Sequence, residues 1–344
     1  MMNLSELEAL PQDKESMIDR RIIFKCRVGS HLYGTNRETS DEDYYGVFLP
    51  STEDLLSLSP CPGELNESAK LSNSLRNQAG DTDCKFFSLQ KFLRLAAEGQ
   101  PGQLEMLFAP TQSIVCSTPE WDQILEHRSS FLSKKGVSAF VGFALSQAHR
   151  ATIKGENLNT IRDLISWSEA LTPQQMNEKL SENFVILEER GEVEFTSNLL
   201  LKYYVNDHGY PQVMLAGRSF DISTKTKYFI ESLKTLEGKY GTRVRAAAES
   251  KYDYKSLGHA VRLLDEAEEF LISGNITLPR PNAEYLKTIL RGTINDSEID
   301  WFNALNSRID HIKQVIEPMS PHPEKPNLKA INDLCIKMLG EHLK

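Results

Sequence analysis

The 344-residue sequence has no apolar run that approaches the roughly 18–20 residues needed to cross a bilayer. Residues 1–20 are polar and acidic and have no apolar core, so we do not expect them to form a signal peptide. The five cysteines are widely scattered and none forms a CxxC pair, which argues against a structural zinc site and against a disulfide framework. Together these absences favour a cytoplasmic protein that has no contact with a membrane.

An overall excess of positive charge is also missing. The 39 Lys and Arg are outnumbered by 48 Asp and Glu, which gives a net charge of −9, so the surface as a whole does not attract polyanions. If the protein binds nucleic acid, a local basic patch would have to provide the binding surface. Residues 225–262 are one candidate because they carry nine Lys or Arg against four Asp or Glu, although such a run is about as often an ordinary solvated surface.

What is present is an ordinary globular composition with room for two domains. Hydrophobic residues make up 40% of the chain and charged residues 25%, which excludes disordered, collagen-like and low-complexity proteins. We expect a polar lead over residues 1–20, a catalytic domain over residues 21–120 and a mainly helical C-terminal domain over residues 121–344. The boundary between the last two is expected near residues 110–135.

Three short β-prone segments are predicted strands, at residues 22–28, 43–49 and 83–87. Residues 57–81 are rich in Ser, Asn, Gly and Pro and are predicted to form a loop. Apolar residues then recur at helical spacing from Leu89 until Gly99, and a further short helix is predicted from residue 104.

The later part of the chain is predicted to be mainly helical. Thr172 and Pro173 fit the N-cap and first turn of a helix. Residues 184–188 and 193–195 suggest a small hairpin. The apolar spacing predicts helices over residues 137–149, 161–171, 224–240 and 254–272.

Two carboxylates mark the start of the second predicted strand. Asp41 and Asp43 stand two positions apart, so on a strand both side chains can lie on one face. A third carboxylate from another strand would allow the group to hold two Mg²⁺ or Mn²⁺ ions, which prefer oxygen ligands and share substrate phosphates. Asp83, at the start of the third predicted strand, fits this position, and Asp81 is the alternative.

A Gly-Ser pair follows the first predicted strand, with Gly29 twelve positions before Asp41. Glycine lets the backbone approach a phosphate, and the Ser30 hydroxyl with nearby N–H groups can hold the terminal phosphates of a nucleotide. A strand, a Gly-Ser turn, a strand with Asp-x-Asp and a third Asp are together typical of phosphoryl transfer.

Other interpretations of these residues differ in strength. A calcium loop is excluded, because Tyr45 occupies its fifth position and Thr52 stands where a bidentate Glu is required. A glycosyltransferase that uses Asp-x-Asp with a divalent metal stays open, although it does not require the upstream Gly-Ser turn. His31 and Tyr33 are more often structural than catalytic.

At these residues a family resemblance becomes specific. The segments GSHLYGT and SDEDYYGV resemble the signature of nucleotidyltransferases of the DNA polymerase beta superfamily, closest to the branch of RNA repair pathway-linked proteins called RlaP. Further similarity lies at Asp83, in residues 89–93, 101–108, 255–264 and 279–281, and at residues 289 and 292. Glu42 departs from the pattern but points away from the two Asp on a strand, and residues 150–220 match poorly.

The resemblance implies an α+β fold, a palm-like mixed sheet with flanking helices plus a helical C-terminal region. It implies transfer of a nucleoside monophosphate from an NTP, with ATP favoured, to a hydroxyl acceptor with release of pyrophosphate. Asp41 and Asp43 would ligate both metal ions, Asp83 would complete one of them, and Gly29 with Ser30 would hold the β- and γ-phosphates. The acceptor would be RNA, although a protein or small-molecule acceptor and a catalytically silent nucleotide- or RNA-binding module stay open.

A cationic stripe on one predicted helix follows from the sequence pattern alone, independently of the family resemblance. Lys255, His259 and Arg262 lie at i, i+4 and i+7 of a predicted helix and form a cationic face away from its apolar side. We expect this face to look toward the carboxylates and to contact the nucleotide phosphates or the acceptor backbone. The alternative is an ordinary solvated helix surface.

Overall fold

The computed structural model describes residues 20–58, 61–69, 82–196, 198–250, 252–294 and 299–343. The chain divides into two compact units. The first unit is formed by Met1–Leu145, Val261–Thr288 and Asn303–Lys344, and the second by Ser146–Ala260 and Ile289–Phe302. This division differs from the predicted one at residue 120, because the first unit also takes in two segments from the last third of the sequence.

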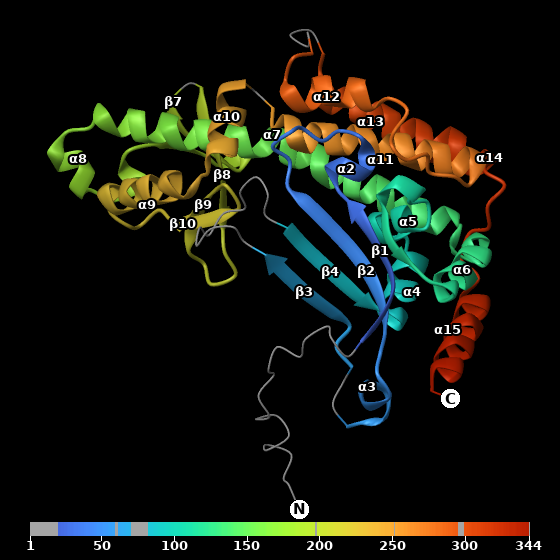
Figure 1. Ribbon diagram of the computed structural model, residues 1–344. Helices are drawn as coiled ribbons and strands as arrows, with labels where there is room; N and C mark the ends of the chain where they lie inside the picture. Colours follow the sequence, from blue (N-terminus) through green and yellow to red (C-terminus); the bar gives the residue numbers. More distant parts are fainter. Residues whose placement is uncertain are drawn as a thin grey trace, which may run out of the picture. The chain divides into compact units, whose positions relative to one another are not determined.

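A mixed five-stranded sheet forms the centre of the first unit (Figure 1). Strands β2 and β4 are parallel neighbours, while the other neighbouring pairs are antiparallel. The strand order is β3-β4-β2-β1-β5, with β1 at Arg21–Val28, β2 at Glu42–Leu49, β3 at Glu64–Ala69, β4 at Thr82–Ser88 and β5 at Ile114–Ser117. The three predicted strands are therefore confirmed, as is the α+β class.

Strand β3 lies within the segment that was predicted to be a loop, so that prediction is wrong for residues 64–69. Its sequence ELNESA is polar because the strand lies at the sheet edge and buries little, so no apolar alternation marks it. It is held by antiparallel pairing with β4. Residues 59–60 and 70–81 of the predicted loop lie outside the described residues, and Asp81 is among them.

Helices α4, α5 and α6 lie on one side of this sheet (Figure 1). The Trp121 ring of α6 stacks on Phe24 of β1 at 3.9 Å between centroids and lies 5.2 Å from Phe92 of α4. The helices that belong wholly to this unit are α2 (Ser30–Tyr33), α3 (Thr52–Leu56), α4 (Leu89–Ala97), α5 (Pro101–Met106), α6 (Pro119–Glu126), α14 (Glu317–Met319) and α15 (Leu328–His342).

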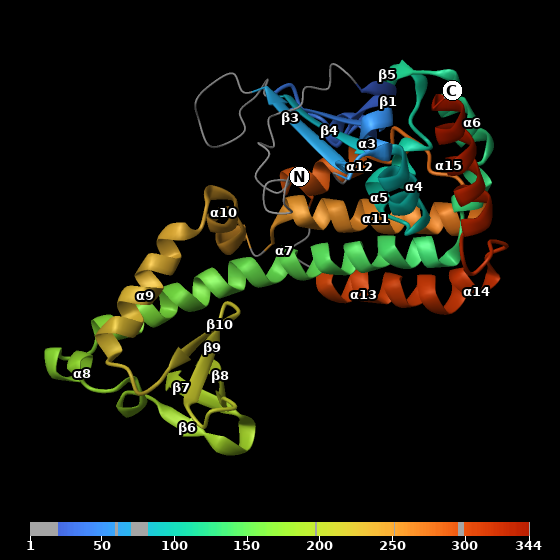
Figure 2. The same cartoon turned by 90° about the horizontal axis from the view of Figure 1, so that it is seen from below.

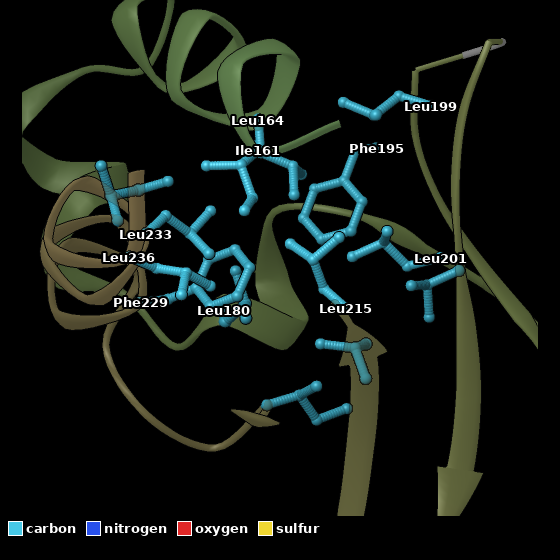
Figure 3. Close-up of a cluster of buried hydrophobic side chains, with 14 residues drawn as sticks. Ile161, Leu164, Leu180, Phe195, Leu199, Leu201, Leu215, Phe229, Leu233 and Leu236 are labelled. Atoms are coloured by element: carbon cyan, nitrogen blue, oxygen red, sulfur yellow. The ribbon is translucent and has the colours of Figure 1, made fainter. Parts of the chain in front are cut away.

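The second unit packs a fully antiparallel sheet against helices. Its core is a cluster of buried side chains that includes Ile161 and Leu164, Phe195 and Leu233 (Figure 3). The strand order is β10-β9-β8-β7-β6, with β6 at Val185–Leu187, β7 at Glu192–Thr196, β8 at Leu199–Val205, β9 at Pro211–Leu215 and β10 at Arg218–Asp221. The helices of this unit are α8 (Pro173–Asn177), α9 (Thr226–Lys239) and α10 (Thr242–Ser250).

The boundaries between the two units fall within four helices. They are α7 (Lys134–Glu169), α11 (Tyr254–Ser273), α12 (Ala283–Arg291) and α13 (Trp301–His311). The two helices predicted over residues 137–149 and 161–171 are one helix, α7. Gly155 in its middle does not end it but lets α10 come close, since a Cβ there would lie 2.9 Å from the Ala247 carbonyl oxygen.

The predicted hairpin is confirmed as β6 and β7, and Thr172 caps α8 as predicted. The expectation of a mainly helical C-terminal part missed β8, β9 and β10. In β8, buried Leu199 and Leu201 alternate with exposed Leu200 and Lys202, which is the two-residue period of a half-buried strand. All five cysteines are free. Among the described residues, no helix is long and apolar enough to cross a membrane.

Candidate active site

A cavity of about 420 Å³ lies in the first unit where the ends of β1, β2 and β4 meet. Residues from every strand of the sheet except β5, and from helices α2 and α5, contribute to its walls. The lining residues are Val28, Gly29, Tyr33, Asp43, Tyr45, Asn66, Asp83, Cys84, Lys85, Gly102 and Glu105.

Two aspartates face this cavity from neighbouring strands. Asp43 of β2 and Asp83 of β4 are direct partners in the parallel register, and Val28 of β1 is the partner of Asp43 on its other side. Residues paired across a sheet point to the same face, so the two carboxylates line one wall. The structure thus brings together two of the three carboxylates that the sequence singled out.

Gly29 brings the backbone beside one of these carboxylates. The residue has φ 66° at the N-cap of α2, and a Cβ there would lie 3.1 Å from Asp43 Oδ2. The turn that follows is tight, because the Tyr33 N–H donates to the Gly29 carbonyl oxygen at 3.1 Å and Gly34 ends the helix in a left-handed conformation. The positive φ therefore favours glycine here, and an added Cβ would also crowd the Asp43 carboxylate.

Ser30 and Asp41 lie beside the cavity in sequence but do not line it. Asp41 precedes the first residue of β2, so the strand does not fix its side chain on the face of Asp43. Among the described residues, no three His, Cys, Asp or Glu side chains are arranged to hold a metal ion. Asp43 and Asp83 nevertheless fit Mg²⁺, which proteins bind through one or two carboxylates while substrate phosphates complete the shell.

The cavity also contains residues that the sequence analysis did not single out. Tyr45 follows Asp43 by two positions and Lys85 follows Asp83 by two, and they are partners in the same register. The alternation that placed the aspartates on one face therefore predicts these two as well. Burial raises the pKa of the Tyr45 hydroxyl, which keeps it a neutral phenol.

Lys85 brings the positive charge to this otherwise acidic wall. Its Nζ lies 2.9 Å from Glu64 Oε1, and Lys91 Nζ lies 3.0 Å from the other oxygen of the same carboxylate. The hydrogen bond to Glu64 raises the pKa of Lys85, so its ammonium stays charged. A cation beside Asp83 can bind a substrate phosphate that approaches the aspartates.

Comparison with known proteins identifies a family for the first half of the chain. Residues 2–172 match the family described as "RNA repair pathway DNA polymerase beta family", RlaP. The N-terminal half of the chain belongs to this family. The RlaP segment contains every residue that lines the cavity, including Gly29, Asp43 and Asp83.

A protein of Enterobacteria phage T4 is similar over nearly the whole length. It is described as an uncharacterized 38.9 kDa protein in the nrdC-mobD intergenic region. The two sequences are 28% identical over 329 residues, which cover 91% of this chain and 94% of the phage protein. No solved structure matches.

A buried hydrogen-bonded cluster joins two residues that line the cavity, Tyr33 and Glu105, to two residues outside the RlaP segment, Arg262 and Glu266. The Tyr33 hydroxyl donates to Glu105 Oε2 at 2.7 Å, and Arg262 Nη1 donates to Glu105 Oε1 at 2.7 Å and to Glu266 at 2.8 Å. The Arg262 guanidinium also lies over the Tyr33 ring, 3.7 Å from its centroid. We call Tyr33, Glu105, Arg262 and Glu266 the Arg262 cluster.

Burial sets the protonation of this cluster. It raises the pKa of Tyr33, so the phenol keeps its proton and donates to Glu105. Burial also raises the pKa of Glu266, against the opposite effect of Arg262. For Arg262, burial lowers the pKa but the surrounding carboxylates raise it more, and the guanidinium stays charged.

The predicted cationic stripe of α11 therefore needs a correction at Arg262. That side chain is buried, its guanidinium contacts the carboxyl groups of Glu105 and Glu266, and it does not line the cavity. The sequence pattern could not show this, because Glu105 lies 157 positions away along the chain. Lys255, which is exposed, and His259 belong to the second unit, and their contact with nucleotide stays a prediction.

Proposed function

We propose that this chain is a metal-dependent nucleotidyltransferase that moves a nucleoside monophosphate from an NTP to a hydroxyl of RNA. One observation carries the proposal above all. Asp43 and Asp83 are register partners on parallel strands and line one cavity with Gly29, inside the segment that belongs to the RlaP family.

The aspartates are the proposed metal ligands. Asp43 and Asp83 would hold Mg²⁺ or Mn²⁺, and Asp41 would join them where a second ion binds. When bound, the ions neutralise the charge that develops on the attacking and leaving oxygens of an in-line displacement.

The remaining cavity residues would orient the triphosphate. The backbone at Gly29 and the Ser30 hydroxyl would bind the β- and γ-phosphates, with Lys85 as a point charge beside them. The acceptor oxygen attacks the α-phosphorus, its proton passes to Asp83, and the bond to the bridging oxygen of the β-phosphate breaks to release pyrophosphate.

RNA is proposed as the acceptor because of the family. Its description places it in an RNA repair pathway, and a hydroxyl at an RNA end is a suitable nucleophile. Transfer to a protein or to a small molecule uses the same chemistry at the same residues, so the acceptor is tested separately from the reaction.

The test is a labelling experiment. Each α-³²P-labelled NTP, with Mg²⁺ or Mn²⁺, is offered with the protein to total RNA and to lysate protein, and the labelled fraction is identified. We expect label in RNA, most strongly from ATP. Asp43→Asn and Asp83→Asn should each lower the rate about 10²–10³-fold or more, because each removes a proposed ligand of the metal ions that stabilise the charge on the reacting phosphates.

A matched control is Asp122→Asn, which removes an exposed carboxylate of α6 that does not line the cavity. It should label as well as the wild type. Full activity of the Asp43 or Asp83 variant would overturn the assignment of the cavity, whereas label in protein alone would overturn only the RNA acceptor.

A further inference from the structure

A second cavity, of about 560 Å³, lies in the first unit and is lined in part by residues of α4 and α15. These two helices are neighbours (Figure 2). This volume is within the range of about 300–1,000 Å³ that is typical of small-molecule sites. It is separate from the candidate active site, since the two cavities share no lining residue. The walls are formed by Gln90, Leu93, Arg94, Ala97, Glu98, Lys135, Lys325, Pro326, Leu328, Ile331, Asn332 and Cys335.

Hydrogen bonds hold the wall that leads into α15. The Lys134 N–H donates to the Pro323 carbonyl oxygen at 2.9 Å, and the Asn327 N–H donates to the Ser130 carbonyl oxygen at 2.8 Å. Lys134 also forms an ion pair with Glu324 at 2.9 Å. The cavity is therefore formed before any ligand arrives, which lowers the cost of binding.

The charge around this cavity is mainly positive. Arg94, Lys135 and Lys325 border it, against one carboxylate, Glu98. Arg94 lies 4.0 Å from Glu98 with both side chains more than half exposed, a weak pair. Within the described part of the chain, Lys135 and Lys325 have no ion-pair partner. Two cations at one rim are thus available to an anion.

The inner walls are apolar. Leu93 and Ile331 present buried aliphatic side chains from opposite helices, and Leu328 is 62% exposed at the entrance. Burial raises the pKa of Cys335, so this residue contributes a neutral thiol. Gln90 Oε1 is buried and has no hydrogen-bond partner among the described residues, which leaves one amide for a polar ligand group.

We propose that this cavity binds a small amphipathic anion, a molecule with an apolar body and a carboxylate or phosphate head. The head lies between Lys135 and Lys325 at the rim. The body packs over Leu328, which is 62% exposed and where water would otherwise contact apolar surface, beside walls that include Leu93 and Ile331. The proposal is independent of nucleotidyl transfer, because none of these residues belongs to the candidate active site.

Isothermal titration calorimetry on the full chain tests it with four probes, octanoate, octyl phosphate, 1-octanol and inorganic phosphate. We expect one molecule of octanoate or octyl phosphate per chain, bound roughly tenfold or more tighter than 1-octanol, and no binding of inorganic phosphate. The two anionic probes distinguish a carboxylate head from a phosphate head.

Two double variants locate the head group. Lys135→Gln with Lys325→Gln should weaken the preferred anion roughly tenfold and leave 1-octanol unchanged. Lys329→Gln with Lys337→Gln is the matched control, because both lysines are exposed on α15 and neither borders the cavity. Absence of anion binding, equal binding of 1-octanol, or equal weakening in both double variants would overturn the proposal.

Discussion

Two lysines bind the same carboxylate, but of the two Lys85 alone borders the candidate active site. Lys85 and Lys91 lie 2.9 and 3.0 Å from the two oxygens of Glu64. If Lys85 binds a substrate phosphate, Lys85→Ala should raise the KM for NTP about tenfold to a hundredfold, since a hydrogen bond to a charged group contributes about 1.5–3 kcal/mol. Initial rates of RNA labelling against NTP concentration measure this.

Lys91→Ala is the control for that experiment. It removes an equivalent bond to Glu64 but no group that lines the cavity, so the KM should stay within about twofold of the wild type. An equal rise in both variants would mean that the Glu64 contacts, rather than a phosphate, explain the effect of Lys85.

We expect Arg262 to stabilise the folded state. Arg262→Ala leaves Glu105 and Glu266 buried without their cation, which should lower the free energy of unfolding by about 3–5 kcal/mol. Urea denaturation followed by tryptophan fluorescence measures it. Lys255→Ala, on the exposed side of the same helix, should change the free energy by less than about 0.5 kcal/mol. A similar small effect of both substitutions would contradict the structural role of Arg262.

These residues also show what the sequence could predict. Asp43 and Asp83 were candidates because they start two predicted strands, while the alternation that paired Asp41 with Asp43 does not fix Asp41, which precedes β2. Lys85 follows from alternation within β4, two positions after Asp83. Arg262 does not, because helical spacing reports which residues share a face but not what covers that face. Only the tertiary contact with Glu105, far away in the sequence, shows that the guanidinium is buried.

At the scale of elements, the turn from β1 to α2 depends on one glycine. Gly29→Ala puts a Cβ 3.1 Å from Asp43 Oδ2 at φ 66°, a conformation that costs a non-glycine residue about 1–3 kcal/mol. We expect this loss in the free energy of unfolding, and lower RNA labelling because Asp43 must move. Chemical denaturation and the labelling assay measure the two effects.

Gly142→Ala is the matched control, because Gly142 lies in α7 with no heavy atom within 4 Å of an added Cβ. It should stabilise the protein by about 0.5–1 kcal/mol. Gly29→Ala with unchanged stability and unchanged labelling would show that the turn tolerates a side chain.

Elements were predictable where burial leaves a pattern. The helix α4 buries apolar residues at helical spacing, and β1 buries Phe24, Cys26 and Val28 at a two-residue period. The strands β2 and β4 instead end in continuous buried runs. The edge strand β3 buries too little to show alternation, and its pairing partner β4 decides its conformation. The middle of α7 was missed for a different reason, because the described residues that it buries there, Ala151, Gly155 and Leu158, include only one large apolar side chain.

At the scale of the molecule, the first unit is assembled from three stretches of chain. A fragment of residues 1–172 contains the whole RlaP segment but lacks Arg262 and Glu266, and it also lacks Arg280, whose N–H donates to the Tyr33 carbonyl oxygen at 3.1 Å. We expect this fragment to show no cooperative thermal unfolding by circular dichroism, while the full chain does. A cooperative transition of the fragment would contradict the need for the later segments.

The sequence boundary predicted near residues 110–135 could not anticipate this arrangement. Composition changes along the chain locate linkers, whereas here the chain leaves the first unit inside a continuous helix, α7, and returns inside another, α11. No Gly- or Pro-rich linker occurs where the chain passes between the units within α7 and within α11. The division is therefore defined by the contacts within each unit and has no mark in the sequence.

The separation of 157 residues between Glu105 and Arg262 also means that the two residues are synthesised at different times. A ribosome that adds about 5–20 residues per second needs about 8–30 s to make that length of chain. Throughout this interval the nascent Glu105 carboxylate has no guanidinium to bind and remains in water, because burying it alone costs several kcal/mol. The cavity that Glu105 borders is therefore completed only late in translation, when the last third of the chain is being made.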